Sequence, residues 1–241
     1  MGDVPDTGCP YRAIRRDTRW TWYDGDRCAS EVSMHVYRRT SVSTNNVLYR
    51  VPDGRRMTDN NTPAKTANPA PLGLLGFGMT TVLLSLHNMG IMPLDNVTLA
   101  MGVFCGGIAQ MIAGIMEYRN GNTFGTVAFT LYGVFWLALV ATRTDLFGAG
   151  SGGDTMGAFC LVWGIMTLFM FIGTLGGRTS LKFVFLTLTV TFLVLTAADL
   201  SGIHTLTAVA GAVGLVCGAS AMYTAFAEVL AEQHGRELLP F

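Results

Sequence analysis

The sequence predicts an all-α membrane protein with six transmembrane helices, and composition, the length of the apolar segments and the placement of charge support this prediction. Of the 241 residues, 50% are hydrophobic and 13% are charged, about half the charged fraction of an average soluble protein. After residue 70 the chain contains repeated apolar segments of about 20 residues, the length that crosses a bilayer as a helix. These segments lack the strict alternation of a β-barrel, so we expect helices.

The six predicted helices follow one another closely along the chain, at residues 72–90, 97–117, 123–143, 155–176, 181–200 and 203–230. Most of the charged residues between Leu72 and Leu230 fall at the joints between them. The first helix is expected to begin sharply, because Asn68 is a favourable N-cap and Pro69 suits the first helical position. Small residues recur at four-residue spacing, which favours close packing of helices within the subunit: Gly102 and Gly106, Gly173 and Gly177, and Ala210, Gly214 and Gly218.

The basic residues predict the orientation of the bundle. Arg143 is the one basic residue at the joints on one side of the membrane, and five lie on the other side: Lys65, Arg119, Arg178, Lys182 and Arg236. Basic residues concentrate on the cytoplasmic side of a membrane protein. We therefore expect both termini in the cytoplasm.

Residues 1–65 form a polar, Arg-rich N-terminal extension, and residues 66–241 form the six-helix transmembrane domain. Residues 1–56 contain ten arginines and seven acidic residues, and no apolar run long enough for a signal peptide. We expect no packed domain there. One interpretation is that translation naturally starts at Met57; the other is a disordered cytoplasmic arm whose arginines contact anionic lipid.

Metal and catalytic chemistry find little support in the sequence. The five cysteines form no CxxC pair and the four histidines are scattered, so we assign no metal, no cofactor and no nucleic-acid partner. Ser220 lies in a Gly-Ala-Ser-Ala stretch that resembles the turn of membrane serine proteases. His204 is sixteen residues away and His87 is near the opposite membrane face, so neither is placed to activate it. We expect no enzyme.

Several motifs resemble the acetate uptake transporter family over residues 66–240. They are NPAPLGLLGFGMTT and LSLHN in the first helix, then GGIAQMIAG, EYRNGNTFGTVAFTLYG, LFMFIGTLGG, FVFLTLTV and GLVCGASAMY. The NPAPLGL heptad is the signature of that family, and the N-terminal extension is where this chain departs from its short bacterial members. The resemblance implies a permease of the inner (cytoplasmic) membrane, a hexamer in which each protomer passes acetate and, less readily, succinate.

The resemblance also implies the residues of the pathway. Its apolar constriction maps onto Phe77, Tyr132 and Leu188, one bulky residue from each odd-numbered helix, and such a ring can block hydrated ions. Gln110, at mid-depth of the second helix, is an amide that either donates to a carboxylate in transit or bonds a neighbouring helix. The residues assigned to substrate binding are Gln110, Thr80, Thr81 and Asn68.

A polar outer vestibule is a hypothesis from helix geometry. Eleven residues after each ring residue, about three turns and roughly 16 Å further along the same face, stand Asn88, Arg143 and Asp199. Arg143 would attract a carboxylate and Asp199 would limit its dwell time. The alternative is that helix ends are polar in any case.

Proton coupling and the exact solute stay open at this point. The ionisable groups in or beside the helices are His87, Glu117, Asp199, His204 and Glu228, all near predicted helix ends. The absence of a charge deep in the bundle favours a channel-like route. Alternatives to an acetate permease are a channel for small neutral solutes such as urea or amides, and a sensor that binds acetate without moving it.

Overall fold

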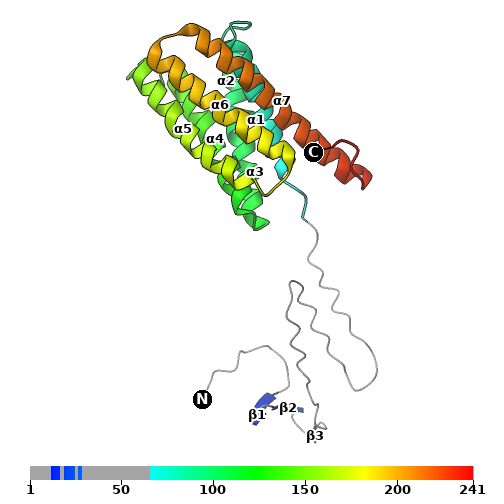
Figure 1. Cartoon of the computed structure of the whole chain (residues 1–241). Coiled ribbons are helices and arrows are strands. Elements are labelled where there is room, and N and C mark those ends of the chain that lie inside the picture. Colours follow the sequence, from blue (N-terminus) through cyan, green and yellow to red (C-terminus); the bar gives the residue numbers. More distant parts are fainter. Residues whose placement is uncertain (1–11, 17–18, 25–26, 29–65, 241) are drawn as a thin grey trace. The chain divides into compact units, whose positions relative to one another are not determined.

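The structure, a computed structural model, describes residues 12–16, 19–24, 27–28 and 66–240 (Figure 1). The chain divides into two compact units, Met1–Pro63 and Ala64–Phe241. The transmembrane domain predicted for residues 66–241 lies within the second unit, and its exact start stays a prediction. Met57, the proposed natural start, lies outside the described residues.

The described part of the first unit is a small antiparallel sheet of three strands, β1 (Arg12–Arg16), β2 (Arg19–Asp24) and β3 (Arg27–Cys28). Arg12 pairs with Tyr23 and Arg16 with Arg19 in the first ladder, and Tyr23 pairs with Cys28 in the second. Sequence analysis did not predict these strands. The β2 sequence RWTWYD is rich in the aromatic and β-branched residues that favour strands.

The second unit is a bundle of α-helices interrupted by one π-helical segment. Its elements are α1 (Ala70–Asn88), α2 (Asn96–Met101), η1 (Gly102–Ala109), α3 (Gln110–Arg119), α4 (Thr123–Arg143), α5 (Gly153–Thr174), α6 (Thr179–Ser201) and α7 (His204–His234). With α2, η1 and α3 counted as one continuous helix, the described residues contain six helices long and apolar enough to cross a membrane. The predicted all-α fold with six transmembrane helices is therefore confirmed for this unit.

Local sequence explains where the helices begin and end. Asp95 accepts hydrogen bonds from the backbone amides of Val97 and Thr98 at the start of α2, and Asn122 accepts one from Gly125 at the start of α4. Gly202 ends α6 in the left-handed region with φ 69°, a conformation that glycine adopts without steric cost.

Helix α1 begins at Ala70, two residues before the predicted segment 72–90 and one residue after the first helical position expected from Asn68 and Pro69. Asn68 accepts a hydrogen bond from the Ala70 amide at 3.1 Å, but Pro69 occupies the N-cap position. The difference is within the usual variation of helix-end assignment. The side chain of Asn68 still stabilises the start of the helix, as expected.

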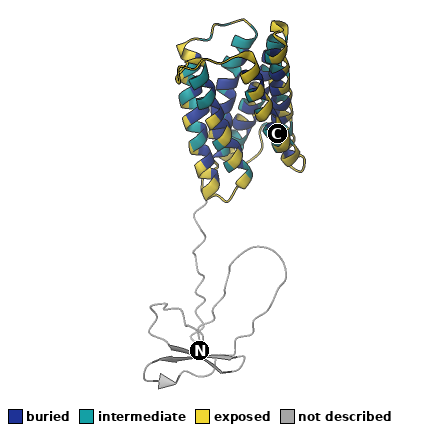
Figure 2. Cartoon of the chain, turned by 90° about the vertical axis from the view of Figure 1, so that its left-hand side faces the viewer, coloured by how far each residue is buried: buried dark blue, intermediate teal, exposed yellow. Residues whose placement is uncertain are grey.

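The spanning helices pack as a bundle in which α1 contacts α7, α5 contacts α6, α6 contacts α7 and α3 contacts α4 (Figure 1). Buried residues face the interior, and exposed residues cover the outer surfaces of the helices (Figure 2). Large apolar side chains such as Phe104, Phe169 and Val162 are among the exposed ones. In a membrane these surfaces contact lipid or other subunits.

Small residues allow the closest helix contacts. A Cβ added to Gly218 of α7 would lie 2.9 Å from the Gly78 carbonyl oxygen of α1, and one added to Gly106 would lie 2.6 Å from the Trp136 ring of α4. Gly214 similarly meets Ser85 of α1. These glycines pack helices within the subunit, as their spacing predicted.

Candidate functional site

A cavity of about 80 Å³ lies inside the bundle between the N-terminal halves of α1, α4 and α6. Along these helices its lining ends at Phe77, Tyr132 and Leu188. Gln110 and Glu117 of α3 and Glu228 of α7 complete the polar part of its wall, and the remaining lining is Ala70, Leu74, Asn122, Phe124, Gly125, Ala128, Phe129, Leu181, Val184 and Phe185. A space of this size accommodates a small solute or a few water molecules.

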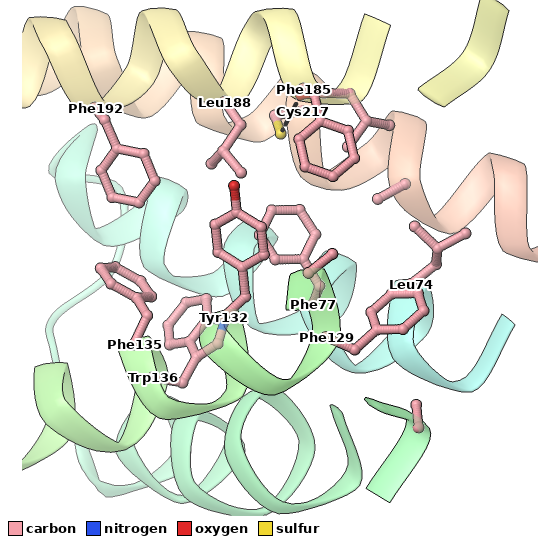
Figure 3. Packing of buried hydrophobic residues seen from close by; sticks show 14 of the residues in the cluster. Leu74, Phe77, Phe129, Tyr132, Phe135, Trp136, Phe185, Leu188, Phe192 and Cys217 are labelled. Carbon is pink, nitrogen blue, oxygen red and sulfur yellow. Dashed lines mark hydrogen bonds between the residues drawn. The ribbon is translucent and has the colours of Figure 1, made fainter. Parts of the chain in front are cut away.

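The three predicted ring residues all line this cavity, and their side chains gather inside the bundle (Figure 3). Phe77, Tyr132 and Leu188 are each at most 5% exposed. The rings of Phe77 and Tyr132 are 5.8 Å apart at an angle of 53°, and Leu188 points from α6 toward Tyr132 (Figure 3). The three side chains form an apolar wall across the end of the cavity.

Tyr132 keeps its one polar group out of the cavity. Its hydroxyl donates to Thr167 Oγ1 of α5 at 2.8 Å, and the Thr167 hydroxyl donates to the Trp163 carbonyl oxygen at 2.7 Å. A buried hydroxyl needs such a partner. With the hydroxyl satisfied, the aromatic ring is what Tyr132 contributes to the constriction.

Beyond the ring, the bundle is filled by aromatic side chains. Phe135 of α4 lies one turn further than Tyr132 and contacts Phe192 of α6 edge to face, with ring centroids 5.2 Å apart. It also contacts Trp163 at 5.2 Å and stacks on Phe159 at 5.6 Å. These residues form one aromatic cluster on the far side of the ring.

Gln110 is the buried amide of the cavity wall. It is 1% exposed, and its carboxamide oxygen Oε1 is buried without a hydrogen-bond partner. Leaving such an atom unsatisfied costs about 1–3 kcal/mol, so each exception calls for an explanation. Gln110 follows directly after η1, and π-helical segments frequently occur at functional sites. The sequence located Gln110 but not the π-helical segment before it.

Two carboxylates lie at the open end of the cavity, and sequence analysis did not bring them together. Glu117 accepts a hydrogen bond from Asn122 Nδ2 at 2.8 Å. Glu228 accepts one from Asn68 Nδ2 at 2.8 Å and forms an ion pair with Arg178 Nη1 at 2.8 Å. Asn68 is 160 residues from Glu228 in the sequence, so spacing gave no signal for this contact. The one indication in the sequence was that Glu117 and Glu228 are isolated charged residues near the ends of apolar helices.

The other residues assigned to substrate binding lie away from the cavity lining. Thr80 donates to the carbonyl oxygens of Gly76 and Phe77, and Thr81 donates to the Phe77 carbonyl oxygen. Asn68 reaches the cavity only through its hydrogen bond to Glu228. The hydroxyls of both threonines are therefore already bonded within α1, and their assignment stays a prediction.

Two of the three predicted vestibule residues lie within electrostatic range of each other. The positive charge of Arg143, at the end of α4, interacts with the carboxylate of Asp199 on α6. Asp199 also accepts a weak hydrogen bond from Cys160 Sγ at 3.7 Å. In the described part of the chain, no hydrogen bond or ion pair joins Asn88, the last residue of α1, to either of them. Arg143 is exposed and Asp199 half-buried.

The part of the chain that the structure describes contains no group of three or more His, Cys, Asp or Glu residues that could hold a metal ion. Within it, Ser220 donates its hydroxyl to the Cys217 carbonyl oxygen at 2.8 Å. This serine is bonded to its own helix backbone rather than to a histidine.

Comparison with known proteins places these features in a family. The sequence model of the GPR1/FUN34/yaaH family matches residues 55–236. The chain belongs to the GPR1/FUN34/yaaH family. The resemblance that the NPAPLGL heptad indicated is thus confirmed, and the match includes all six transmembrane helices.

Two relatives and one solved structure are similar to this chain in sequence. The succinate-acetate/proton symporter SatP of Escherichia coli K12 is 54% identical over 180 residues, which cover 73% of this chain and 95% of that protein. The ammonia transport outward protein 2 of Saccharomyces cerevisiae is 35% identical over 181 residues, 70% of this chain and 64% of that protein. The solved structure of the bacterial acetate channel SatP matches with a TM-score of 0.72 and 53% identity, and covers 73% of this chain and 99% of the other.

These findings establish a multi-pass membrane protein of a family with named transporters and channels. The solved structure and the bundle described above share the same fold over the transmembrane unit. The cavity with its apolar end wall therefore lies in the part of the chain that this family shares.

Proposed function

We propose that this chain moves acetate and, less readily, succinate across the membrane through the cavity inside each protomer. The observation that supports this most directly is the combination of a small cavity, an apolar ring at its deep end and the buried amide side chain of Gln110 in its wall. Its relatives' names, a succinate-acetate/proton symporter and an acetate channel, supply the substrate class.

Phe77, Tyr132 and Leu188 form the constriction of this pathway. An apolar constriction excludes ions that keep their water shell, and it accommodates the methyl group of acetate. Gln110 carries an NH₂ group that can donate to a carboxylate. Together they select a short carboxylate with an apolar end over a large or strongly hydrated anion.

The proposal extends to orientation and assembly. Both termini lie in the cytoplasm, because Lys65, Arg119, Arg178, Lys182 and Arg236 fall at one end of the bundle and Arg143 at the other. The open end of the cavity, with Glu117 and Glu228, then faces the cytoplasm. The membrane is the cytoplasmic one, and the chain works as a homo-oligomer, a hexamer by resemblance to the family. It acts as a transporter rather than as an enzyme.

Uptake of labelled acetate by sealed proteoliposomes tests this function. We expect flux above that of protein-free vesicles, and a higher flux in Leu188→Ala because the ring is opened. Leu186→Ala is the matched control, since Leu186 lies on the same helix and is 44% exposed. No protein-dependent acetate flux would overturn the transport proposal and favour a sensor. Equal flux of labelled urea would favour the channel for neutral solutes.

A further inference from the structure

The cavity contains negative charge and no positive side chain in its lining. The charged lining residues are Glu117 and Glu228. A carboxylate that enters the cavity, as the proposed function requires, therefore approaches two groups of its own charge. Like charges in a poorly solvated space disfavour one another strongly, so the structure must offset at least part of this charge.

Glu228 is already neutralised by its neighbours. Arg178 donates to its Oε1 and Asn68 to its Oε2, both at 2.8 Å. The side chain of Glu228 is 9% exposed, whereas that of Arg178 is 51% exposed. The ion pair and the amide hydrogen bond offset the negative charge of Glu228.

Glu117 differs from Glu228 in that no positive group pairs with it among the described residues. It is 3% exposed, and its hydrogen-bond donor is the neutral amide of Asn122 at 2.8 Å. The negative charge of Glu228 acts on it. A buried carboxylate without a cationic partner is costly unless it binds a proton.

The packing fixes the position of the Glu117 side chain. A Cβ added to Gly125 of α4 would lie 2.8 Å from Glu117 Cδ and 2.9 Å from its Cγ. The absence of a side chain at Gly125 therefore makes room for the carboxyl group against α4. Glu117 keeps its place in the cavity wall.

Gln110 gives an independent indication that a ligand binds near Glu117. Its Oε1 is buried without a partner and can accept a hydrogen bond from the O–H of water or of a protonated acid, whereas its NH₂ group can donate to a carboxylate. Gln110 lines the same cavity as Glu117. Gln110 and Glu117 are seven residues apart on α3, which is about two turns and roughly 10 Å along one helix face. A carboxylate bound at Gln110 is thus within electrostatic reach of Glu117.

We propose that Glu117 is the proton-binding residue of the transport cycle and that its protonation is coupled to carboxylate binding at Gln110. A proton from water at the cavity mouth forms an O–H bond with a Glu117 carboxyl oxygen, and no electron is transferred. The substrate then enters a cavity in which Glu117 is neutral, so one of the two negative charges in the lining is removed. The proton returns to water after the substrate has left. This inference rests on the proposed function.

The groups facing Glu117 define the expected pH dependence. Glu228 of α7 faces Glu117, with Arg178 behind Glu228. The hydroxyl of Tyr132 is directed to Thr167 of α5 instead, and the cavity linings of α1 and α6 contribute no titratable group. Two like charges about 10 Å apart at an effective dielectric constant of about 20 change an affinity by roughly tenfold. Coupling of this size acts equally on proton and substrate binding.

The test is the half-saturation concentration of labelled acetate in proteoliposomes at several pH values, after subtraction of flux in protein-free vesicles. We expect this concentration to rise about tenfold in the wild type as pH increases through the titration of Glu117. In Glu117→Gln, the neutral isostere of the protonated residue, we expect the low value at every pH. Glu237→Gln, at an exposed residue, is the matched control and should follow the wild type.

A second variant keeps the inference falsifiable if Glu117→Gln does not fold. Asn122→Asp preserves the N-cap of α4 and replaces the amide donor to Glu117 by a negative charge, so the pH profile should move to higher pH. An unchanged profile in Asn122→Asp, or wild-type pH dependence in Glu117→Gln, would overturn the proton site while leaving transport intact. Absence of protein-dependent flux in the wild type would instead overturn the proposed function.

Discussion

The two halves of the bundle on either side of the ring are built differently, although α1, α4 and α6 run through both. Between the ring and Glu117 lies a cavity with an unsatisfied amide and two carboxylates in its wall. Beyond the ring, Phe135, Phe159 and Phe192 fill the space with aromatic contacts. The half toward Glu117 thus contains space and polar groups for a small polar solute. In the half toward Arg143, aromatic side chains occupy the space between the helices.

This difference indicates which half of the bundle must change conformation before a solute can cross the membrane. The half toward Glu117 needs little rearrangement to admit a small molecule. The other half opens only if the aromatic side chains beyond the ring change position, because packed interiors leave no continuous space. The ring and the aromatic residues behind it therefore control passage, and variants on each side should act differently.

The largest expected effect is on the cavity side, from Gln110→Leu. Removing the carboxamide leaves no polar group to bind a carboxylate at mid-depth. A hydrogen bond to a charged group contributes about 1.5–3 kcal/mol, so acetate flux at low concentration should fall by about tenfold or more. Gln233→Leu, at an exposed position of α7, is the matched control. Flux equal to that of the wild type would show that Gln110 serves only the packing of α3.

The next effect is on the closed side, from Phe135→Ala. This change removes a ring that contacts Phe159, Trp163 and Phe192, and we expect acetate flux to rise several-fold together with a lower melting temperature in detergent, since large-to-small core changes destabilise proteins. Phe169→Ala, at a residue 69% exposed, should change neither. A Phe135→Ala protein that is folded and has wild-type flux would contradict the closed half as a barrier.

A smaller effect is expected from Arg143→Ala at the far end of the bundle. Arg143 is exposed, and exposed charges contribute about 0–1 kcal/mol, so the half-saturation concentration for acetate should rise by at most about fivefold. Arg236→Ala provides a control at the opposite end. An unchanged half-saturation concentration would remove Arg143 from the pathway and leave its interaction with Asp199 as an ordinary surface contact.

The smallest effect is expected from Thr80→Val and Thr81→Val, just beyond the ring on α1. Both hydroxyls donate to carbonyl oxygens of their own helix, and these are changes of similar volume. Uptake of labelled acetate should stay within about twofold of the wild type, because such local hydrogen bonds add little to a helix. A larger loss would mean that the hydroxyls contact substrate during transport, as the family motif suggested.

The transmembrane fold was predictable because its signals are local. Each span is a continuous apolar segment, and Asn122 and Asp95 cap the helices that follow them. The ring at Phe77, Tyr132 and Leu188 was found through family motifs rather than through physics, because apolar residues in apolar helices look alike. The structure then placed all three at the end of one cavity.

What sequence analysis missed depends on contacts between distant parts of the chain. The links from Asn68 to Glu228 and from Arg178 to Glu228 join residues 160 and 50 positions apart. The π-helical segment Gly102–Ala109 is as apolar as the α-helices around it, so an apolar pattern does not indicate it. The strands β1 to β3 lie in the Arg-rich extension. No packed structure was expected there because the extension lacks apolar runs, although the short segment RWTWYD contains strand-forming residues.

The length of α7 has a consequence for the lipid in which this protein works best. The helix has 31 residues, about 46 Å at 1.5 Å per residue, whereas the hydrocarbon layer is about 30 Å thick. Glu228, 24 residues after His204 and about 36 Å along α7, lies just past that thickness when His204 is at the opposite interface. Thinner bilayers leave the Glu228 end in the headgroup layer, and thicker ones draw it toward hydrocarbon. Bilayer thickness thus sets how readily water reaches the cavity mouth.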